Sequence, residues 1–253
     1  MICVHHDWGV KGVKYALKKK HLVIIVDVIR FSSAVVTAVA SGFTVYPVPD
    51  LEKGRRLADK TGAELAGKAG EARYSLSPLS YLENTRRGNK KVVLPSPNGA
   101  TCATMLKNDN SGYIGCFLNA AGVARQAQKT AEETGRDITV VAAGEERAVE
   151  KDGFIYYIRD SPERVFAVED YLGSGAIISY MNCDKDPDAR LCERAYEAVK
   201  NIMTDLLFES YSGRWLLQNN ARKDLEHLIQ MNYYDVVPEI NDGKISEIKR
   251  NLH

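Results

Sequence analysis

Residues 22–33 read Leu-Val-Ile-Ile-Val-Asp-Val-Ile-Arg-Phe-Ser-Ser. The apolar, β-branched run from Leu22 to Val26 is typical of a strand that is buried on both faces, as strands of parallel sheets are. We expect a helix to follow through Ala34–Ala40, with Ser32 or Ser33 as its N-cap and Gly42 just after its end. The segment therefore predicts a strand, a polar turn and a helix, which together form a β–α unit.

The same alternation continues along the chain. Further strands are predicted at 44–48, 91–94, 113–117 and 138–142, and helices at 51–61, 100–106 and 120–133, with Asp50 and Asn119 as caps of the first and last. The final third is predicted to be mainly helical, at 167–181, 187–208 and 220–231, before a strand-like segment from Asp235 that stops at Pro238. The pattern indicates an α/β fold with a largely parallel or mixed sheet, flanking helices and a helical C-terminal third.

One charged segment, 145–164, interrupts this rhythm. It carries an aromatic patch at Phe154–Ile158 between two polar flanks. We interpret it as a surface insertion, and a hairpin or a lid over a site are the alternatives.

No proline- or serine-rich linker and no internal repeat divides the chain, so residues 1–253 are expected to form one compact domain, with two lobes as the alternative.

The overall composition excludes several classes of protein. Of the 253 residues, 45% are hydrophobic and 26% charged, as in ordinary globular proteins, and the formal charge of +1 does not favour nucleic acid. No apolar run reaches the roughly 18 residues of a membrane span, and the N-terminus does not read as a signal peptide. The five cysteines show no Cys-x-x-Cys spacing, so neither a disulfide framework nor a zinc site is indicated and a reducing, cytoplasmic location is expected.

Polar side chains follow most of the predicted strands. They are Asp27, Arg30, Ser32 and Ser33, then Gly70-Glu71, then Ser96, Asn98 and Gly99, then Asn119, and then Gly144-Glu145, while Glu169-Asp170 opens a helix. Ligands of open α/β sheets bind at the carboxyl ends of the strands, where such residues would meet. Hard oxygen ligands with an arginine, hydroxyls and helix N-termini suit Mg²⁺ and a phosphate. Zinc is not expected, because the five histidines are scattered and His5-His6 lacks ligand spacing.

Each of these residues also has a purely structural interpretation. Asp27 can pair with Arg30 or cap the next helix, and the serines can be caps. Glu71 can be a surface acid, residues 96–99 only a turn, and Glu169-Asp170 first-turn acids that the helix dipole favours. Motifs for a nucleoside triphosphate, a dinucleotide, a serine hydrolase elbow and a cysteine phosphatase loop are all missing from the sequence.

The segment Val26–Ser33 resembles the Asp-Val-Leu-Arg-Ala-Thr-Thr segment of the 2-phosphosulfolactate phosphatase family. Further segments follow in that family's order: Gly70-Glu71, Ser77-Pro78, Asn98-Gly99, 117–120, Ala143-Gly144, Glu169-Asp170, Gly175-Ala176, 212–216 and 235–238. The likeness extends from about Leu22 to Ile245, and the ordered series is more specific than any one segment.

The resemblance implies an α/β fold and Mg²⁺-dependent hydrolysis of (R)-2-phospho-3-sulfolactate to 3-sulfolactate and phosphate, a step of coenzyme M biosynthesis in methanogens. It also implies a homodimer. On this hypothesis the metal is bound from among Asp27, Glu71, Glu169 and Asp170, and catalysis involves Asp27, Arg30 and Asn98. The substrate is bound by Arg30, Ser32, Ser33, Ser96, Asn98, Gly99, Asn119 and Gly144. Direct attack by water and an aspartyl-phosphate on Asp27 both stay open.

The sequence departs from the family pattern in four places. Phe31-Ser32-Ser33 replaces Ala-Thr-Thr, Leu76 stands where asparagine is usual, 95–100 replaces a threonine-rich turn, and 145–164 is longer than usual. These departures motivate two alternatives. One is a non-catalytic protein that binds a phosphorylated metabolite, and the other is an enzyme of a different reaction type acting on a phosphorylated or sulfonated acid.

Overall fold

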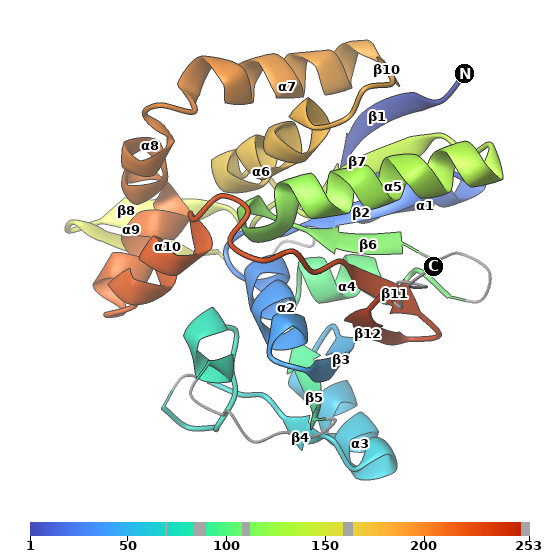
Figure 1. Cartoon of the computed structure of the whole chain (residues 1–253). Helices are drawn as coiled ribbons and strands as arrows, with labels where there is room; N and C mark the ends of the chain where they lie inside the picture. Colours follow the sequence, from blue (N-terminus) through green and yellow to red (C-terminus); the bar gives the residue numbers. More distant parts are fainter. Residues whose placement is uncertain (69, 83–89, 108–111, 159–163, 249–253) are drawn as a thin grey trace.

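The computed structural model describes residues 1–68, 70–82, 90–107, 112–158 and 164–248. It has a ten-stranded mixed sheet with flanking helices, and most of the C-terminal third is helical (Figure 1). The predicted α/β class is therefore confirmed. No helix of the described residues combines the length and the apolar character that crossing a membrane requires.

Two parallel blocks make up the sheet. The larger block contains, in spatial order, β10 (Asp184–Lys185), β1 (Cys3–Trp8), β7 (Ile138–Ala142), β2 (Leu22–Val26) and β6 (Gly112–Gly115). The smaller contains β3 (Phe43–Val48), β5 (Lys90–Pro95) and β4 (Glu64–Leu65). The C-terminal hairpin of β11 (Pro238–Asn241) and β12 (Lys244–Glu247) lies between them and pairs antiparallel with β6 and β3. The end of the chain thus joins the two blocks into one sheet.

Helices connect and cover the strands. They are α1 (Gly9–Lys18), α2 (Phe31–Ala40), α3 (Leu51–Thr61), α4 (Gly99–Ala103), α5 (Ala120–Thr134), α6 (Val168–Ser179), α7 (Pro187–Val199), α8 (Met203–Glu209), α9 (Tyr211–Gln218) and α10 (Arg222–Leu228), with short 3₁₀ turns at Pro78–Tyr81 and Phe117–Asn119. The helices α8, α9 and α10 gather beside a separate hairpin of β8 (Ala148–Lys151) and β9 (Phe154–Tyr157) (Figure 1).

The centre of the core is formed by β2, β7 and α2. Every residue of β2 and β7 is buried, as their continuous apolar runs predict. Helix α2 buries all its residues except Ala40, which is typical of a helix that packs on several sides. The polar segment that begins with Asp27 connects β2 to α2. Because both elements are buried, the core holds the side chains of this segment in place.

Several local predictions are confirmed, and the predicted side-chain caps by Ser32 or Ser33 and by Asn119 are wrong. The Asp50 carboxylate accepts a hydrogen bond from the Lys53 amide, and Gly42 has a φ of +82° just after α2. However, α2 begins at Phe31 with Arg30 as its N-cap, so Ser32 and Ser33 lie inside the first turn. Their hydroxyls therefore serve buried backbone groups instead of capping the helix.

The C-terminal elements differ from the prediction in their boundaries. The helix expected over 187–208 is two helices, α7 and α8, and α9 was not foreseen. The last strand begins at Pro238 instead of stopping there, because a proline is tolerated as the first residue of a strand. Strand β1 and helix α1 were also missed, since the mixed histidine and acidic content of residues 3–8 hides the strand pattern.

The charged segment 145–164 contains the antiparallel hairpin β8–β9, which matches the hairpin alternative. Its residues 159–163 lie outside the described part of the chain. The backbone on either side of this segment is joined where Glu145 and Val165 exchange two hydrogen bonds.

Candidate functional site

Four acidic side chains lie close enough together to affect one another's titration: Asp27, Glu145, Glu169 and Asp170. They come from three places in the fold: the end of β2, the segment just after β7 and the first turn of α6. Asp27, Glu169 and Asp170 are 4%, 2% and 3% exposed, whereas Glu145 is half-buried. The predicted meeting of acids at the carboxyl ends of the strands is therefore present, and Glu145 is its most accessible member.

Asp27 is fixed by two backbone amides. Its Oδ1 accepts a hydrogen bond from the Phe31 amide at 3.1 Å, and its Oδ2 accepts one from the Gly99 amide at 2.7 Å. The Asp27 amide in turn donates to Ser32 Oγ at 2.9 Å. Asp27 thus ties the end of β2 to the starts of α2 and α4, and its carboxylate has one defined orientation.

Asp170 is held in the same manner from another direction. Its Oδ1 accepts from the Val28 amide at 2.7 Å and its Oδ2 from the Gly144 amide at 3.0 Å. Gly144 has a φ of +74°, and a Cβ there would lie 2.9 Å from the Val165 carbonyl oxygen. A glycine is therefore required for the amide to reach this carboxylate.

The two glutamates are positioned by side chains. Glu145 Oε1 accepts from Asn98 Nδ2 at 2.8 Å and from the Glu146 amide at 2.7 Å. Glu169 accepts from the hydroxyl of Ser212, and Ser212 Oγ also accepts from the Tyr157 hydroxyl at 3.1 Å. The hairpin β8–β9 and helix α9 therefore contribute to the acidic cluster, although neither contains one of its carboxylates.

Burial raises the pKa of all four acids, and the charges of neighbouring acids add to this for Glu145, Glu169 and Asp170. Burial raises the pKa of Asp27 to about 6, against the lowering effect of the Gly99 and Phe31 amides. Burial, with the Asp27 and Glu169 charges adding to it, raises the pKa of Glu145 to about 8. The pKa of Glu169 is raised by burial, and that of Asp170 well above its ordinary value by burial and the Asp27 and Glu169 charges. Clustered carboxyls of this kind favour either bound protons or a bound cation.

Two arginines lie next to the acids and lower the pKa of Asp27 by their charge. Arg30 Nη1 donates to Asp224 Oδ2 at 2.9 Å, and its guanidinium lies 5.7 Å from the centre of the Trp215 ring. Arg164 Nε donates to Asn98 Oδ1 at 2.5 Å. Both side chains are mostly buried, at 15% and 22% exposure, and guanidinium groups held in this way are suited to binding oxyanions.

Glu71 does not join the cluster. Its side chain is 70% exposed and its Oε1 lies 3.9 Å from Lys68 Nζ. Among the described residues, the acids whose charges raise the pKa values of Glu145, Glu169 and Asp170 do not include Glu71. The predicted role of Glu71 as a metal ligand is therefore not supported by its position, because its pairing with Lys68 is that of a surface acid.

Half of the predicted substrate-binding residues use their side chains to bond to backbone groups. Ser33 Oγ donates to the Val28 carbonyl at 2.8 Å, and Ser32 Oγ accepts from the Asp27 amide. The Asn119 side chain does not cap α5: its Oδ1 accepts from the Cys116 amide and its Nδ2 donates to the Ile114 and Val236 carbonyls. The Gly99 and Gly144 amides donate to carboxylates, and Ser96 Oγ accepts from the Asn98 amide at 3.4 Å. Ser32, Gly99 and Gly144 bond directly to Asp27 or Asp170, and of the predicted set only Arg30 and Asn98 present charged or amide side chains beside the acidic cluster.

Sequence reasoning missed several neighbours of the cluster. Glu145 was noticed at the end of a strand but was left out of the candidate ligands, and Arg164, Ser212, Trp215 and Asp224 were not singled out as site residues. Arg164 and Asp224 reach the site only through tertiary contacts, so no spacing in the sequence indicates them. The position of Glu145 directly after β7, next to Gly144, was the one signal that was available.

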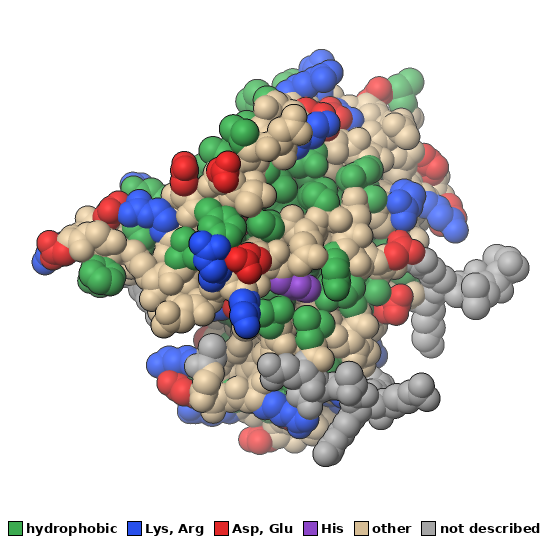
Figure 2. Space-filling model, turned by 60° about the vertical axis from the view of Figure 1, so that its left-hand side comes forward, with side chains coloured by type: hydrophobic (Ala, Val, Ile, Leu, Met, Phe, Trp, Pro, Cys, Tyr) green, Lys and Arg blue, Asp and Glu red, His purple; other side chains and the backbone are tan. Residues whose placement is uncertain are grey.

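The face that carries α8–α10 and β8–β9 has mixed charge. Figure 2 shows basic and acidic side chains interspersed with apolar ones there, without a broad area of either sign. This agrees with the nearly neutral formal charge of +1. An anionic ligand would therefore be attracted by a few local groups such as Arg30 and Arg164, and the surface as a whole would contribute little.

An α/β sheet with clustered acids and arginines at its strand ends is an arrangement suited to hydrolases of small phosphorylated acids. A sequence model of the 2-phosphosulpholactate phosphatase family matches residues 10–243. The chain belongs to this family.

Two relatives illustrate how far the similarity extends. A probable 2-phosphosulfolactate phosphatase of Caldanaerobacter subterraneus subsp. tengcongensis is 25% identical over 240 residues, which cover 90% of each chain. The 2-phosphosulfolactate phosphatase of Methanothermobacter thermautotrophicus is 26% identical over 234 residues, or 92% of this chain and 93% of the relative. The resemblance inferred from short segments is thus confirmed over nearly the whole chain, and with it the class of phosphoric monoester hydrolases.

Proposed function

We propose that this protein is a Mg²⁺-dependent phosphatase that hydrolyses (R)-2-phospho-3-sulfolactate to 3-sulfolactate and phosphate. The observation that carries the proposal is the cluster of four carboxyls whose pKa values burial raises, beside Arg30 and Arg164, in a chain of this family. Such a substrate bears phosphate, sulfonate and carboxylate groups. The acids alone would repel it, so the site needs both a cation and the arginines.

The donors of the cluster suit Mg²⁺. They are carboxylate oxygens, which this cation prefers, and burial disfavours their charged forms unless a cation is close by. We propose Asp27, Glu145, Glu169 and Asp170 as the residues that hold the ion, with Glu145 in place of Glu71. Bound Mg²⁺ supplies positive charge against the phosphoryl oxygens, which is a main requirement of phosphoryl transfer.

The two arginines are proposed to bind the anionic groups of the substrate. Arg30 is kept in place by Asp224, and Asp224 also accepts a hydrogen bond from Ser77 Oγ. Because the guanidinium is already ordered, its side chain loses little conformational entropy when the substrate binds. Arg164 and Asn98 hold each other on the other side of the cluster. A fixed guanidinium binds phosphate or sulfonate oxygens through two parallel hydrogen bonds.

Two residues are suited to the chemical step. Asp27 is the most rigidly held carboxylate, and it can attack phosphorus or orient a water molecule that does so. Glu145 is the most accessible acid, and with a pKa near 8 it can exchange protons with the leaving oxygen or the water. Trapping of labelled phosphate on the protein distinguishes the two routes, since only nucleophilic attack by Asp27 leaves a phosphoenzyme.

The test is phosphate release from a panel of 2-phosphorylated carboxylic acids, with Mg²⁺ and with a chelator. We expect turnover that requires Mg²⁺ and is fastest with 2-phospho-3-sulfolactate. The substitution Asp27→Asn should lower kcat at least ~100-fold. It removes a negative charge, and it sets the side-chain NH₂ of asparagine against a backbone N–H that now donates to the carboxylate. Asp59→Asn, on the exposed face of α3, is the matched control and should retain full activity.

Two results would contradict the proposal. Unchanged activity of the Asp27→Asn variant would remove Asp27 from the mechanism. Saturable binding of the phosphorylated acids without any phosphate release would establish the alternative, a non-catalytic binding protein. Product analysis of the same reactions would expose a different reaction type.

The cellular setting is part of the proposal. A role in coenzyme M biosynthesis follows from the proposed substrate, and a cytoplasmic location is supported by the five free cysteines. A homodimer is supported by the resemblance and by two exposed aromatic side chains of β9, Phe154 at 55% and Tyr156 at 52% exposure. Light scattering of the purified protein measures this state directly.

A further inference from the structure

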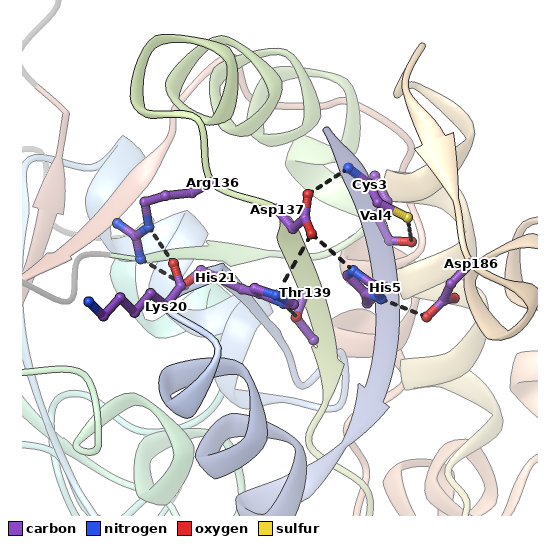
Figure 3. A network of polar contacts seen from close by, with 9 residues as sticks. All are labelled: Cys3, Val4, His5, Lys20, His21, Arg136, Asp137, Thr139 and Asp186. Atoms are coloured by element: carbon purple, nitrogen blue, oxygen red, sulfur yellow. Dashed lines mark hydrogen bonds and ion pairs between the residues drawn. The ribbon is translucent and has the colours of Figure 1, made fainter. Parts of the chain in front are cut away.

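A second polar cluster lies at the opposite end of the same strands. Figure 3 shows His5, His21 and Asp137 facing one another. His5 is in the middle of β1, while His21 and Asp137 directly precede β2 and β7. The parallel register pairs Leu22 with Ile138, so the residues before them come side by side, and it sets His5 opposite Thr139 on the neighbouring strand. This cluster is thus at the amino ends of β2 and β7, whereas the four carboxyls lie beyond their carboxyl ends.

The distances in the cluster are those of potential metal ligands. His5 Nε2 lies 3.5 Å and His21 Nε2 lies 3.9 Å from Asp137 Oδ2. One ligand atom from each of the three residues lies within 4.8 Å of the others. A tetrahedral zinc ion with bonds of roughly 2.0–2.1 Å sets its ligand atoms about 3.3 Å apart. The carboxylate oxygen is therefore close to its required position, and the centres of the two stacked imidazole rings lie 4.8 Å apart.

The outer nitrogens of both rings are held by oxygen partners. His5 Nδ1 lies 2.8 Å from Asp186 Oδ2, and His21 Nδ1 lies 2.9 Å from Thr139 Oγ1. When Nδ1 donates to these oxygens, each ring is neutral and the lone pair of its Nε2 faces Asp137. A carboxylate behind a histidine is the usual support of a metal-binding imidazole.

One atom of the cluster lacks a hydrogen-bond partner. Within the described part of the chain, His5 Nε2 is buried and makes no hydrogen bond. The Asp137 carboxylate is also oriented, because its Oδ1 accepts from the Cys3 amide at 2.8 Å. Arg136 donates to the carbonyls of Lys20 and His21, which fixes the backbone that carries the second imidazole. A buried nitrogen without a hydrogen bond, 3.5 Å from a fixed carboxylate oxygen, is a position that a bound cation would satisfy.

We propose that His5, His21 and Asp137 bind a zinc-class divalent transition metal through Nε2, Nε2 and Oδ2, with water as the fourth ligand. Two imidazoles and one carboxylate suit zinc and its neighbours, whereas Mg²⁺ prefers oxygen ligands. Side-chain exposures of 26% and 35% for His5 and Asp137 leave a path for the ion to enter. The metal fastens β1 to the starts of β2 and β7, and through Asp186 to the N-terminus of α7.

The test is a titration of metal-free protein with Zn²⁺ against a chromophoric chelator, in excess Mg²⁺ so that the acidic cluster is already occupied. We expect one Zn²⁺ per chain, and Co²⁺ in its place should give the visible absorption of a tetrahedral complex. His5→Ala and His21→Ala should each weaken binding at least ~100-fold, and Asp186→Asn roughly 10–100-fold. Zn²⁺ should also raise Tm, since only the folded chain holds the ligands together.

Two matched controls separate this site from others. His6 lies on the same strand but packs against the rings of Trp8 and Tyr171, so His6→Gln should bind Zn²⁺ like the unaltered protein. Asp27→Asn should do so as well, because it changes only the other cluster. Circular dichroism tests whether each variant is folded. If an alanine variant is unfolded, Asp137→Asn serves as a milder substitution in the same site.

Either of two results would overturn the proposal. One is undiminished binding of Zn²⁺ by the folded double variant His5→Ala/His21→Ala. The other is a folded, unaltered protein that takes up no Zn²⁺ or Co²⁺ under the same conditions.

Discussion

Hydrogen bonds from individual backbone amides set the orientation of two carboxylates in the acidic cluster. Asp27 and Asp170 each accept two of them, and two of the four donors are the glycines Gly99 and Gly144. A Cβ on Gly99 would lie 2.4 Å from Phe31 Cδ1 and 2.7 Å from Asp27 Oδ2. The absence of a side chain at this position is therefore what allows α4 to approach the carboxylate.

The substitution Gly99→Ala should therefore reduce activity strongly and destabilise the fold by roughly 1–3 kcal/mol, the usual cost of forcing extra atoms into a packed region. Steady-state kinetics and urea unfolding measure the two effects. Gly122→Ala in α5 is the control, because the nearest atom to its Cβ is 3.4 Å away. It should be neutral or slightly stabilising, since alanine favours a helix. A Gly99→Ala variant as active and stable as the control would contradict this account.

The elements around the site differ in how firmly they are attached. Strand β2 and helix α2 are buried in the core, whereas the hairpin β8–β9 lies outside the main sheet. It contacts α9 through the Tyr157–Trp215 ring contact, the Arg214–Glu150 ion pair and several hydrogen bonds. Gln218 provides two of these hydrogen bonds, because its Oε1 accepts from the Ile155 amide at 3.0 Å and its Nε2 donates to the Gly153 carbonyl at 3.1 Å. The same hairpin carries Tyr157, which bonds to the Ser212 that holds Glu169.

Replacing Gln218 by alanine should therefore loosen the hairpin without unfolding the protein. Each lost hydrogen bond contributes about 0.5–1.5 kcal/mol, so exchange of the Ile155 amide should become roughly tenfold faster while Tm changes little. Hydrogen exchange measures this directly. Asn219→Ala is the control, because within the described residues the Asn219 side chain bonds to the Trp215 carbonyl of α9 and not to the hairpin. Equal exchange rates in both variants would show that Gln218 does not hold the hairpin.

On the scale of the whole molecule, stability and function oppose each other at the acidic cluster. Four acids with raised pKa values favour the protonated state in the folded chain. For Glu145 the pKa is about 8 in the folded protein against an ordinary 4.5, so the proton is bound more tightly by the folded chain. The stability that this proton contributes is complete below about pH 4.5 and is lost as the pH rises through about 8.

Without Mg²⁺, Tm should accordingly fall as the pH rises from about 5 to about 8, the window of this titration. Added Mg²⁺ should raise Tm more at the upper end of the window than at the lower, because protons compete with the ion for the carboxylates. Glu145→Gln should reduce both effects, and Asp59→Asn should alter neither. Thermal unfolding over a pH series with and without Mg²⁺ tests this, and equal stabilisation by Mg²⁺ at both ends would sink it.

Much of the architecture could be predicted from local pattern. The run Leu22–Val26, the cap at Asp50 and the glycine at Gly42 each follow from preferences that act within a few residues. Strand β1 could not be recognised, because His5, His6 and Asp7 take their places through contacts made elsewhere in the fold. The same holds for α9, whose boundaries depend on packing against α8 and the hairpin.

The sequence by itself determined the α/β class, the central β–α unit and the family, since these depend on periodicity and on ordered segments along the chain. Only the tertiary structure decided which acids meet: it brought Glu145 to Asp27 and left Glu71 exposed on the surface. It also set His5 beside His21, although they are far apart in the sequence and their spacing gave no sign of a metal site. The physical reason is that strand register and packing fix distances between side chains, and residue spacing along the chain does not encode them.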